Sequence, residues 1–474
     1  MAAMDIPPAE LLSNVSHAVP GQLLVTELFF QVPLDYADPS GGTITLFARR
    51  VSKLERPIFP PEHDDDSHDY NGAQLKPYMV YLEGGPGFGN REPNEHPITR
   101  AVLARGYQLL FLDHRGVGMS TPVSTAMLAT LGDADAQARY LRLMRQDNTV
   151  RDCEAVRKCL TDGWPASKAS WSIFGQSYGG FVSLSYLSMH PEGLREVFLT
   201  GGLAPVGQAI DDVYRATFSR TAERNEQYFA KFPDDVHALG QLATYIESRG
   251  RVPLPAGGSL TVPRLLTSGL LFGAHGGFDM VHNLLLHLKT SLDQFGFFTR
   301  AALQAVESFI AFDTNIIYAI LHEAIYCDGP GQSSNWSAYR VGRDLGPFSW
   351  LKSGRDCSNP SRQPLYFSGE MIFPLHFETY PELIPLRQVA EKLAAADDWP
   401  RLYDEQQLRN NAIPVYAMSY VEDMYVDYDF ARQTAKLVKG TKVAETNIMY
   451  HSALRAKSEE VLQTLFSLRD DVLD

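Results

Sequence analysis

The sequence predicts an α/β fold with a mostly parallel central sheet flanked by helices. Three short apolar runs, PYMVYLEGG, YQLLFLDHRG and WSIFGQSYGG, each end in a turn that contains glycine. Continuous apolar runs of this length are typical of strands buried on both faces of a parallel sheet. Helical segments separate the runs, most clearly at 135–160, where apolar residues recur at intervals of three and four. Alternation of strand, turn and helix predicts a doubly wound sheet.

Two further strands are expected before these runs. Residues 23–36 are rich in Val, Thr, Phe and Leu, and TITLFARRV at 43–51 follows a Pro-Ser-Gly-Gly turn. This pattern predicts an antiparallel pair. The acidic stretch 60–72 follows, and it groups carboxylates with histidines. Because it has no ligand spacing and is dominated by turn formers, we predict a solvated surface loop there in preference to a metal site.

The alternation of strands and helices is interrupted once. After Pro205 the sequence becomes mainly helical for a long stretch, with aromatic segments and polar loops. PVYAMSYVED and TKVAETNIM then restore the strand pattern, and a charged helix is expected from Ser452 onward. The simplest division is a core in two parts, 1–204 and 412–474, with an inserted, mainly helical cap domain at 205–411.

Composition and charge exclude several classes of protein. The 474 residues carry 42 basic and 56 acidic side chains, for a net charge of −14. Nucleic-acid binders normally carry a basic footprint, so no nucleic-acid partner is expected. No run of about 18 apolar residues occurs, so no membrane span is expected either. The first residues lack the basic and apolar regions of a signal peptide, and we expect a cytoplasmic protein.

The four cysteines are too few for a disulfide framework in a chain of this length. They form no CxxC pair and no zinc-binding spacing with histidine, so no metal site is expected. We expect buried thiols, although one pair could bridge. The residues are Cys153, Cys159, Cys327 and Cys357.

The pentapeptide GQSYG at 175–179 places a serine between a predicted strand and a predicted helix. It follows WSIF and precedes FVSLSYLSMH, which is the setting of a nucleophile elbow. Gly175 and Gly179 suit it because the chain turns too sharply there for a Cβ atom. Ser177 would stand at the helix N-terminus, where free N–H groups favour developing negative charge. We therefore predict Ser177 as a nucleophile, against the alternative of a tight glycine turn with an incidental serine.

A serine nucleophile needs a base, and the base needs an orienting acid. In α/β-hydrolases the three follow in the order Ser, acid, His, each on a loop after a sheet strand. His451 is the only histidine after His376 and lies between TKVAETNIM and the last helix, so it is the predicted base. The acid should follow PVYAMSYV. Asp423 is the first aspartate there and is preferred, with Asp427 next and Glu422 third.

An oxyanion hole needs two backbone N–H donors aimed at the carbonyl oxygen. One is expected from Tyr178, directly after the nucleophile, and the other from Gly85 in the loop LEGGPG. A phosphate-binding loop is excluded because Pro86 lacks an N–H and the glycine spacing and lysine of such loops are absent. The loop DHRGVGMS at 113–120 ends the next strand, and its charged residues are expected to pin the loops beside the site.

These motifs together resemble proline iminopeptidase (prolyl aminopeptidase), a family of α/β-hydrolase serine peptidases. The shared features are GGPG after one strand, D-x-R-G-x-G-x-S after the next, GQSYGG, and a cap before the acid and the histidine. The resemblance covers about residues 23–203 and 413–474. It implies an α/β-hydrolase fold and removal of an N-terminal residue, preferably proline.

The family holds the free amine of its substrate with two glutamates of the cap. The counterparts in this sequence are Glu323 in LHEAIY and Glu370 in FSGEMIF, and the resemblance implies that they bind the substrate amino group. A protonated amine taken from water must be paired, which a carboxylate achieves. The segments depart from the family pattern, since His322 replaces a tryptophan. Glu83 also replaces the usual histidine before the oxyanion loop, where it could favour a cation or repel an oxyanion.

The predicted function is therefore a serine aminopeptidase that works through an acyl-enzyme intermediate, without metal or organic cofactor. Its expected partner is a peptide or amino-acid amide with a free N-terminus. One alternative is an esterase or other acyl hydrolase with the same triad, since a fold does not determine a substrate. A second alternative, of another class, is a catalytically inactive hydrolase that serves as a binding protein.

Overall fold

The computed structural model describes residues 4–54, 75–352 and 364–472. The predicted surface loop 60–72 and Cys357 lie outside the described residues. Within them, nine strands form one sheet in the order β1-β2-β3-β5-β4-β6-β7-β10-β11. Their bounds are β1 (Glu10–Val19), β2 (Leu23–Pro33), β3 (Thr43–Lys53), β4 (Tyr78–Leu82), β5 (Gln108–Leu112), β6 (Trp171–Gln176), β7 (Leu194–Thr200), β10 (Val415–Tyr420) and β11 (Thr441–Thr446).

The sheet is parallel from β5 to β11 and antiparallel at its other edge. Strands β2 and β3 pair antiparallel along their whole length, as predicted for 23–36 and 43–51. The edge strand β1 pairs with β2 and was not expected from the sequence. Most of its side chains are exposed, so it lacks the apolar alternation that marks a half-buried strand.

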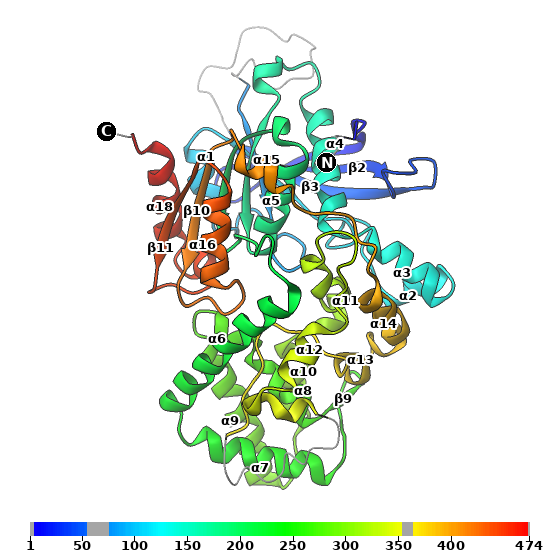
Figure 1. The fold of residues 1–474 in the computed structure, drawn as a ribbon, viewed down its shortest axis with the longest axis vertical. Helices are drawn as coiled ribbons and strands as arrows, with labels where there is room; N and C mark the ends of the chain where they lie inside the picture. Colours follow the sequence, from blue (N-terminus) through cyan, green and yellow to red (C-terminus); the bar gives the residue numbers. More distant parts are fainter. Residues whose placement is uncertain (1–3, 55–74, 353–363, 473–474) are drawn as a thin grey trace.

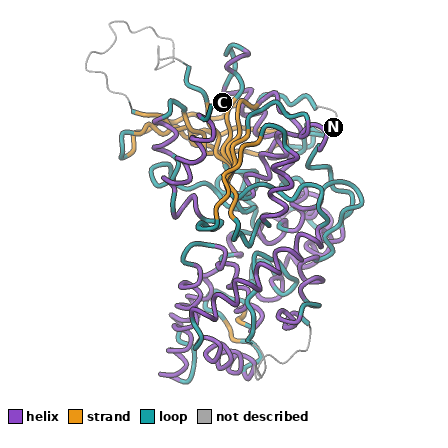
Figure 2. Tube along the Cα trace, turned by 60° about the vertical axis from the view of Figure 1, so that its left-hand side comes forward, coloured by secondary structure: helices purple, strands orange, loops and turns teal. Residues whose placement is uncertain are grey.

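Helices cover both faces of the sheet, which confirms the doubly wound arrangement (Figure 2). Apolar side chains of α4, α5 and α16 pack on one face. Side chains of α1, α17 and α18 pack on the other. The bounds are α1 (Thr99–Ala104), α2 (Thr125–Thr130), α3 (Ala134–Arg142), α4 (Gln146–Leu160), α5 (Tyr178–Met189), α15 (Glu405–Arg409), α16 (Tyr428–Leu437), α17 (Ala453–Ala456) and α18 (Ser458–Asp470).

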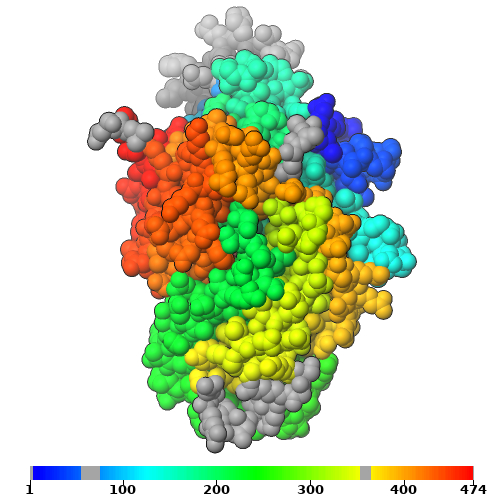
Figure 3. Space-filling model, in the orientation of Figure 1, coloured from blue at the N-terminus to red at the C-terminus, as the bar shows by residue number. Residues whose placement is uncertain are grey.

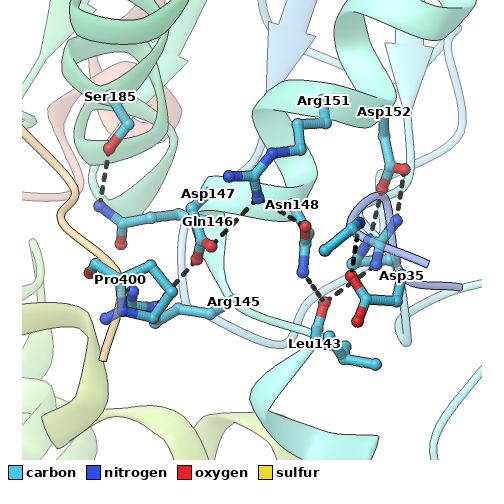
Figure 4. Close-up of polar contacts among 12 residues, drawn as sticks. Asp35, Leu143, Arg145, Gln146, Asp147, Asn148, Arg151, Asp152, Ser185 and Pro400 are labelled. Atoms are coloured by element: carbon cyan, nitrogen blue, oxygen red, sulfur yellow. Dashed lines mark hydrogen bonds and ion pairs between the residues drawn. The ribbon is translucent and has the colours of Figure 1, made fainter. Parts of the chain in front are cut away.

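The region predicted as helical at 135–160 contains two helices, α3 and α4, with a break before Arg145. Arg145 has an extended backbone and a side chain that is 0% exposed. Its guanidinium bonds Asp147 at 3.0 Å (Figure 4). It also bonds the carbonyl oxygens of Cys327 and Pro400, both at 2.7 Å. The break allows the Arg145 guanidinium to reach carbonyl oxygens that lie far away in the sequence. Apolar periodicity alone does not show where the helix is interrupted.

The chain between β7 and β10 is mainly helical, and its part from α6 to α14 forms the lower half of the molecule (Figure 1). We call it the helical segment. It contains α6 (Ile210–Lys231), α7 (Asp235–Ser248), β8 (Val252–Pro253), β9 (Ser259–Leu260), α8 (Val262–Leu266), α9 (Gly277–Phe295), α10 (Arg300–Phe309), α11 (Ile316–Leu321), α12 (Ser337–Gly342), α13 (His376–Thr379) and α14 (Arg387–Ala395).

The helical segment has an apolar core of its own, which also takes in side chains of α2 and α3. Its last residues pack against the body around the sheet. Leu402 and Leu408 already pack in the apolar cluster under the sheet. In Figure 3 the start of the helical segment and the C-terminal part of the chain form one continuous surface where they meet.

Two findings bear on the environment of the protein. None of the helices in the described ranges has both the length and the apolar character that a bilayer span requires. Cys153, Cys159 and Cys327 are free thiols, and the first and last of these are buried.

Candidate active site

Ser177 occupies a tight turn between β6 and α5. Its backbone adopts φ 54° and ψ −123°, a strained conformation for a residue with a side chain. The turn also requires close approach of neighbouring backbone. A Cβ atom at Gly179 would overlap the carbonyl oxygen of Leu82, and one at Gly180 would overlap that of Gly202. Close packing of the backbone therefore requires glycine at these two positions. The turn places Ser177 at the end of the sheet.

Ser177, His451 and Asp423 form a hydrogen-bonded chain. Ser177 Oγ lies 2.7 Å from His451 Nε2, and His451 Nδ1 lies 2.7 Å from Asp423 Oδ2. The other carboxylate oxygen of Asp423 accepts the backbone N–H groups of Tyr425 at 2.9 Å and Val426 at 3.1 Å. These bonds fix the carboxylate and leave Oδ2 for the histidine, the arrangement needed to activate a serine.

The other two candidate acids have different positions. Asp427 accepts the N–H groups of Asp429 and Phe430, both at 3.0 Å, and caps α16. Glu422 lies 3.7 Å from the guanidinium of Arg220 on α6. Of the three acids, Asp423 is the one that contacts His451.

The triad is shielded from water. Asp423 is 2% exposed and His451 is 5% exposed. Burial lowers the pKa of His451, but the charge and hydrogen bond of Asp423 and the charge of Glu370 outweigh it, so the pKa lies above its ordinary value. The ring of Tyr425 packs edge-on against His451 with centroids 4.7 Å apart. These contacts hold one orientation of the imidazole.

The glycine loop after β4 lies directly beside Ser177. A Cβ atom at Gly84 would meet the Cβ of Ser177 at 3.0 Å, and Gly85 has a φ of 127° that suits glycine. Gly84, Gly85 and Ser177 line the same cavity. Tyr178 is the first residue of α5. This arrangement brings the loop predicted to hold one oxyanion donor next to the nucleophile.

Two charged groups hold the loops around the site. Asp113 accepts the backbone N–H groups of Asn90 at 2.7 Å and Met119 at 3.0 Å, so it links two loops. Arg115 bonds both carboxylate oxygens of Asp152, at 2.7 and 2.6 Å. Asp113 and Arg115, which were predicted to hold the loops beside the site, therefore do so through two separate sets of contacts.

A cavity of about 390 Å³ opens over Ser177 and His451. Its wall is largely apolar and aromatic, with one carboxylate and one guanidinium, those of Glu370 and Arg455. The cavity has a volume typical of small-ligand sites. It is lined by Gly84, Gly85, Phe88, Gln176, Ser177, Leu270, Leu271, Ala274, Ser308, Phe309, Ile310, Ala311, Phe312, Asn315, Tyr318, Glu370, Tyr425, His451, Ser452 and Arg455.

Glu370 presents an ionised carboxylate to this cavity. Its side chain is 15% exposed, and the hydroxyl of Tyr318 donates to Oε1 at 2.6 Å. His322 Nε2 lies 3.9 Å from Oε2. Burial raises the pKa of Glu370, but His322, His451 and the hydroxyl of Tyr318 outweigh it and hold the pKa below its ordinary value. The carboxylate therefore stays charged near the nucleophile.

Glu323 does not reach this cavity. It is 7% exposed, and its Oε1 accepts the backbone N–H of Ala338 at 2.9 Å, near the start of α12. Burial raises the pKa of Glu323 above its ordinary value. Of the two glutamates predicted to bind an amine, the structure places Glu370 in the cavity and turns Glu323 toward the backbone of the helical segment.

Glu83 is buried under the oxyanion loop and is paired. Its Oε1 accepts the N–H of Gly84 at 2.8 Å and lies 3.2 Å from the guanidinium of Arg455. The charge of Glu83 is thus compensated, which reduces any repulsion of an oxyanion. Sequence reasoning does not find Arg455, which lies in α17, four residues after His451.

Comparison with known proteins agrees with this geometry. Residues 77–248 match the family model described as alpha/beta hydrolase fold. Proline iminopeptidase aneH of Aspergillus aculeatus is 38% identical over 470 residues, which cover 99% of each chain. A proline iminopeptidase of Aeromonas sobria is 41% identical over 448 residues, covering 94% of this chain and 96% of its own.

Solved structures are more distant in sequence. Rv0554 from Mycobacterium tuberculosis aligns over 94% of this chain and 100% of its own, with a TM-score of 0.39 and 14% identity. The two full-length relatives, at 38% and 41% identity, establish the relationship. The chain belongs to the proline iminopeptidase family of α/β-hydrolases.

Proposed function

We propose that this protein is a serine aminopeptidase that releases an N-terminal residue, preferably proline, from peptides. The observation that carries the proposal is the carboxylate of Glu370 in the cavity that Ser177 also lines. A protonated amine that enters such a cavity needs a carboxylate partner, whereas an ester substrate has no charge to pair with it. The two long relatives named proline iminopeptidase support the preference for proline.

In the proposed reaction, Glu370 binds the α-ammonium group and so places the first carbonyl over the nucleophile. His451 Nε2 takes the hydroxyl proton of Ser177 while Oγ attacks the carbonyl carbon. Asp423 stabilises the imidazolium that forms. The carboxylate of Glu370 also raises the pKa of His451, which makes it a stronger base.

The tetrahedral intermediate carries its negative charge on the former carbonyl oxygen. Gly85 and Tyr178 are the proposed N–H donors to that oxygen, because the glycine loop and the start of α5 flank Ser177. His451 then protonates the amine of the leaving peptide, and the bond to the first residue breaks. In the second half of the reaction His451 activates a water molecule, which hydrolyses the acyl-enzyme and releases the amino acid from Ser177.

The cavity suits an N-terminal proline. A protonated proline amine keeps two N–H donors, which a carboxylate can accept. Aromatic rings of Phe312 and Tyr425 line the cavity and offer an apolar surface to a pyrrolidine ring.

The proposal is tested by turnover of three substrates: a chromogenic proline amide, its N-acetylated twin and a short-chain ester. An aminopeptidase cleaves the free-amine amide fast and leaves the acetylated one nearly untouched. Ester cleavage with both amides untouched would keep the triad and reject the peptidase, in favour of the acyl hydrolase alternative. No turnover of any substrate would favour an inactive binding protein.

We also propose a cytoplasmic location. The free thiols of Cys153, Cys159 and Cys327 suit a reducing compartment. Cell fractionation with an antibody against the protein tests this. Recovery in the secreted fraction would contradict it.

A further inference from the structure

We propose that Arg455 binds the C-terminal carboxylate of the peptide, so that short zwitterionic peptides are the preferred substrates. This inference rests on the proposed aminopeptidase activity and extends it to the far end of the substrate. The proposal starts from the charges of the catalytic cavity. One carboxylate, Glu370, and one guanidinium, Arg455, contribute to its lining.

The two charges come from different parts of the chain and have different partners. Glu370 belongs to the helical segment and accepts the hydroxyl of Tyr318. Arg455 lies in α17, after the catalytic histidine, and pairs with Glu83. Each therefore presents its charge to the cavity independently. Both also act on His451, because the charge of Glu370 raises the pKa of His451 while that of Arg455 lowers it.

The guanidinium of Arg455 has donors to spare. The contact with Glu83 joins a single atom, Nη2, to Oε1 at 3.2 Å. An arginine has five N–H donors in a fork that fits a carboxylate. The side chain is 44% exposed, so these donors face a region open to ligand, whereas that of Glu83 is 3% exposed. The buried Glu83 therefore holds Arg455 through one N–H group and leaves the remaining N–H groups of the guanidinium available to an anion.

A short peptide matches this charge pattern. Its α-ammonium and α-carboxylate lie at opposite ends, with the first carbonyl between them. A dipeptide spans at most about 7 Å and a tripeptide about 11 Å. The cavity of about 390 Å³ accommodates molecules of this size. Binding at both ends would fix the position of the first carbonyl relative to Ser177, which speeds the reaction by orientation.

The test compares free and C-amidated forms of the same peptides, Pro-Ala and Pro-Ala-Ala. We expect kcat/KM of the better free peptide to exceed that of its amide by at least about fivefold, the effect of a half-exposed charged hydrogen bond. A free-to-amide ratio near one for both lengths in the unmodified enzyme would overturn the proposal without any variant. Cleavage of the amides in that case would leave the aminopeptidase assignment intact.

Variants test whether Arg455 causes the preference for the free peptides. Arg455→Met should bring the free-to-amide ratio close to one, and Arg455→Lys should restore part of it. Lys457→Met removes the same charge from a nearby side chain that is 33% exposed, and it should keep the full ratio. Glu83→Gln combined with Arg455→Met avoids a buried unpaired carboxylate, so it reports on binding even if Arg455→Met does not fold. An unchanged ratio in the double variant would reject the assignment.

A further pair of substrates separates the two sources of a carboxylate. Pro-Glu-NH2 and Pro-Gln-NH2 differ by one side-chain charge and lack a terminal carboxylate. The proposal expects similar kcat/KM values for these two. An Arg455-dependent preference for Pro-Glu-NH2 that exceeds the preference for free Pro-Ala would assign Arg455 to acidic side chains and overturn the terminal-carboxylate assignment. If none of these peptides is cleaved, the aminopeptidase activity fails and this inference fails with it.

Discussion

The backbone N–H of His275 donates to Ser452 Oγ at 2.9 Å, so a residue of the helical segment holds the neighbour of His451, the proposed catalytic base. The imidazole of His275 reinforces the contact, because its Nδ1 lies 3.1 Å from the same hydroxyl and its Nε2 accepts the N–H of Tyr450 at 3.5 Å. Both neighbours of His451 are thus tied to one side chain. The helical segment therefore helps to position the base as well as to shape the cavity.

His275→Ala should lower kcat several-fold, about 3- to 10-fold, because the loop that carries His451 loses these side-chain contacts. We expect a smaller change in KM, since His275 is not among the residues that line the cavity. Steady-state kinetics on a proline amide measures both. His237, which is exposed, provides the matched control His237→Ala. Equal rates for the two variants would contradict a positioning role.

Ser177→Ala should give a folded protein with almost no turnover. In the proposed reaction the hydroxyl is the attacking group, and the methyl group of alanine fits where the serine side chain packs. Turnover and thermal unfolding, measured on the same preparation, separate a lost nucleophile from a lost fold. A variant that keeps most of its activity would remove Ser177 from the reaction.

The acid limb of the pH–rate profile should report the raised pKa of His451. The neutral imidazole is the active base, so activity falls as the pH drops through this pKa. Glu370 raises the pKa of His451, and Glu370→Gln should therefore move the acid limb to lower pH. Inactivation by a neutral organophosphate reads this limb without an amine substrate. The exposed Glu459 provides the control Glu459→Gln, which should leave the acid limb where it is. An unmoved acid limb in Glu370→Gln would contradict the electrostatic effect of Glu370 on His451.

Tyr318→Phe removes the hydroxyl that donates to Glu370 Oε1. A hydrogen bond to a charged group is worth about 1.5–3 kcal/mol, so kcat/KM for a proline amide should fall by about tenfold or more. The rate of organophosphate inactivation should change much less, because that reagent carries no amine. Tyr245→Phe, in the remote helix α7, is the control. Equal losses with both reagents would indicate a general disturbance of the site.

Arg145→Met should destabilise the protein by about 2 kcal/mol or more, because it removes the nearest cation from the buried Asp147, which keeps only Arg151 at 3.2 Å. It also removes donors from the carbonyl oxygens of Cys327 and Pro400. Denaturant unfolding followed by tryptophan fluorescence measures the loss. The exposed Arg215, paired with Asp212, gives the control Arg215→Met, for which a change below about 1 kcal/mol is expected.

The core fold and the triad were accessible from the sequence because each depends on local patterns. Ser177 sits in a glycine pentapeptide after an apolar run, and Asp423 and His451 follow strands that alternate with helices. In parallel α/β sheets the ends of successive strands meet at one edge, so order along the chain predicts proximity. The edge strand β1 and the break before Arg145 lack such a pattern.

The environment of the amine site could not be predicted in the same way. Tyr318 and Glu370 are 52 residues apart, and their contact depends on how the helical segment packs. The motif that suggested Glu323 gave its position in the chain but not the direction of its side chain. The backbone N–H of Ala338, in α12, binds the carboxylate of Glu323. A backbone donor of this kind leaves no periodic pattern in the sequence, so its contact with Glu323 could not be predicted.

The most direct test of the account compares Glu370→Gln with Glu323→Gln on a chromogenic proline amide. We predict that Glu370→Gln loses about 2–5 kcal/mol in transition-state binding, thirty-fold or more in kcat/KM, since it leaves an ammonium unpaired. Glu323→Gln should lose far less, because an amide oxygen still accepts the N–H of Ala338. An unchanged kcat/KM for Glu370→Gln would contradict the central claim that this carboxylate binds the substrate amine.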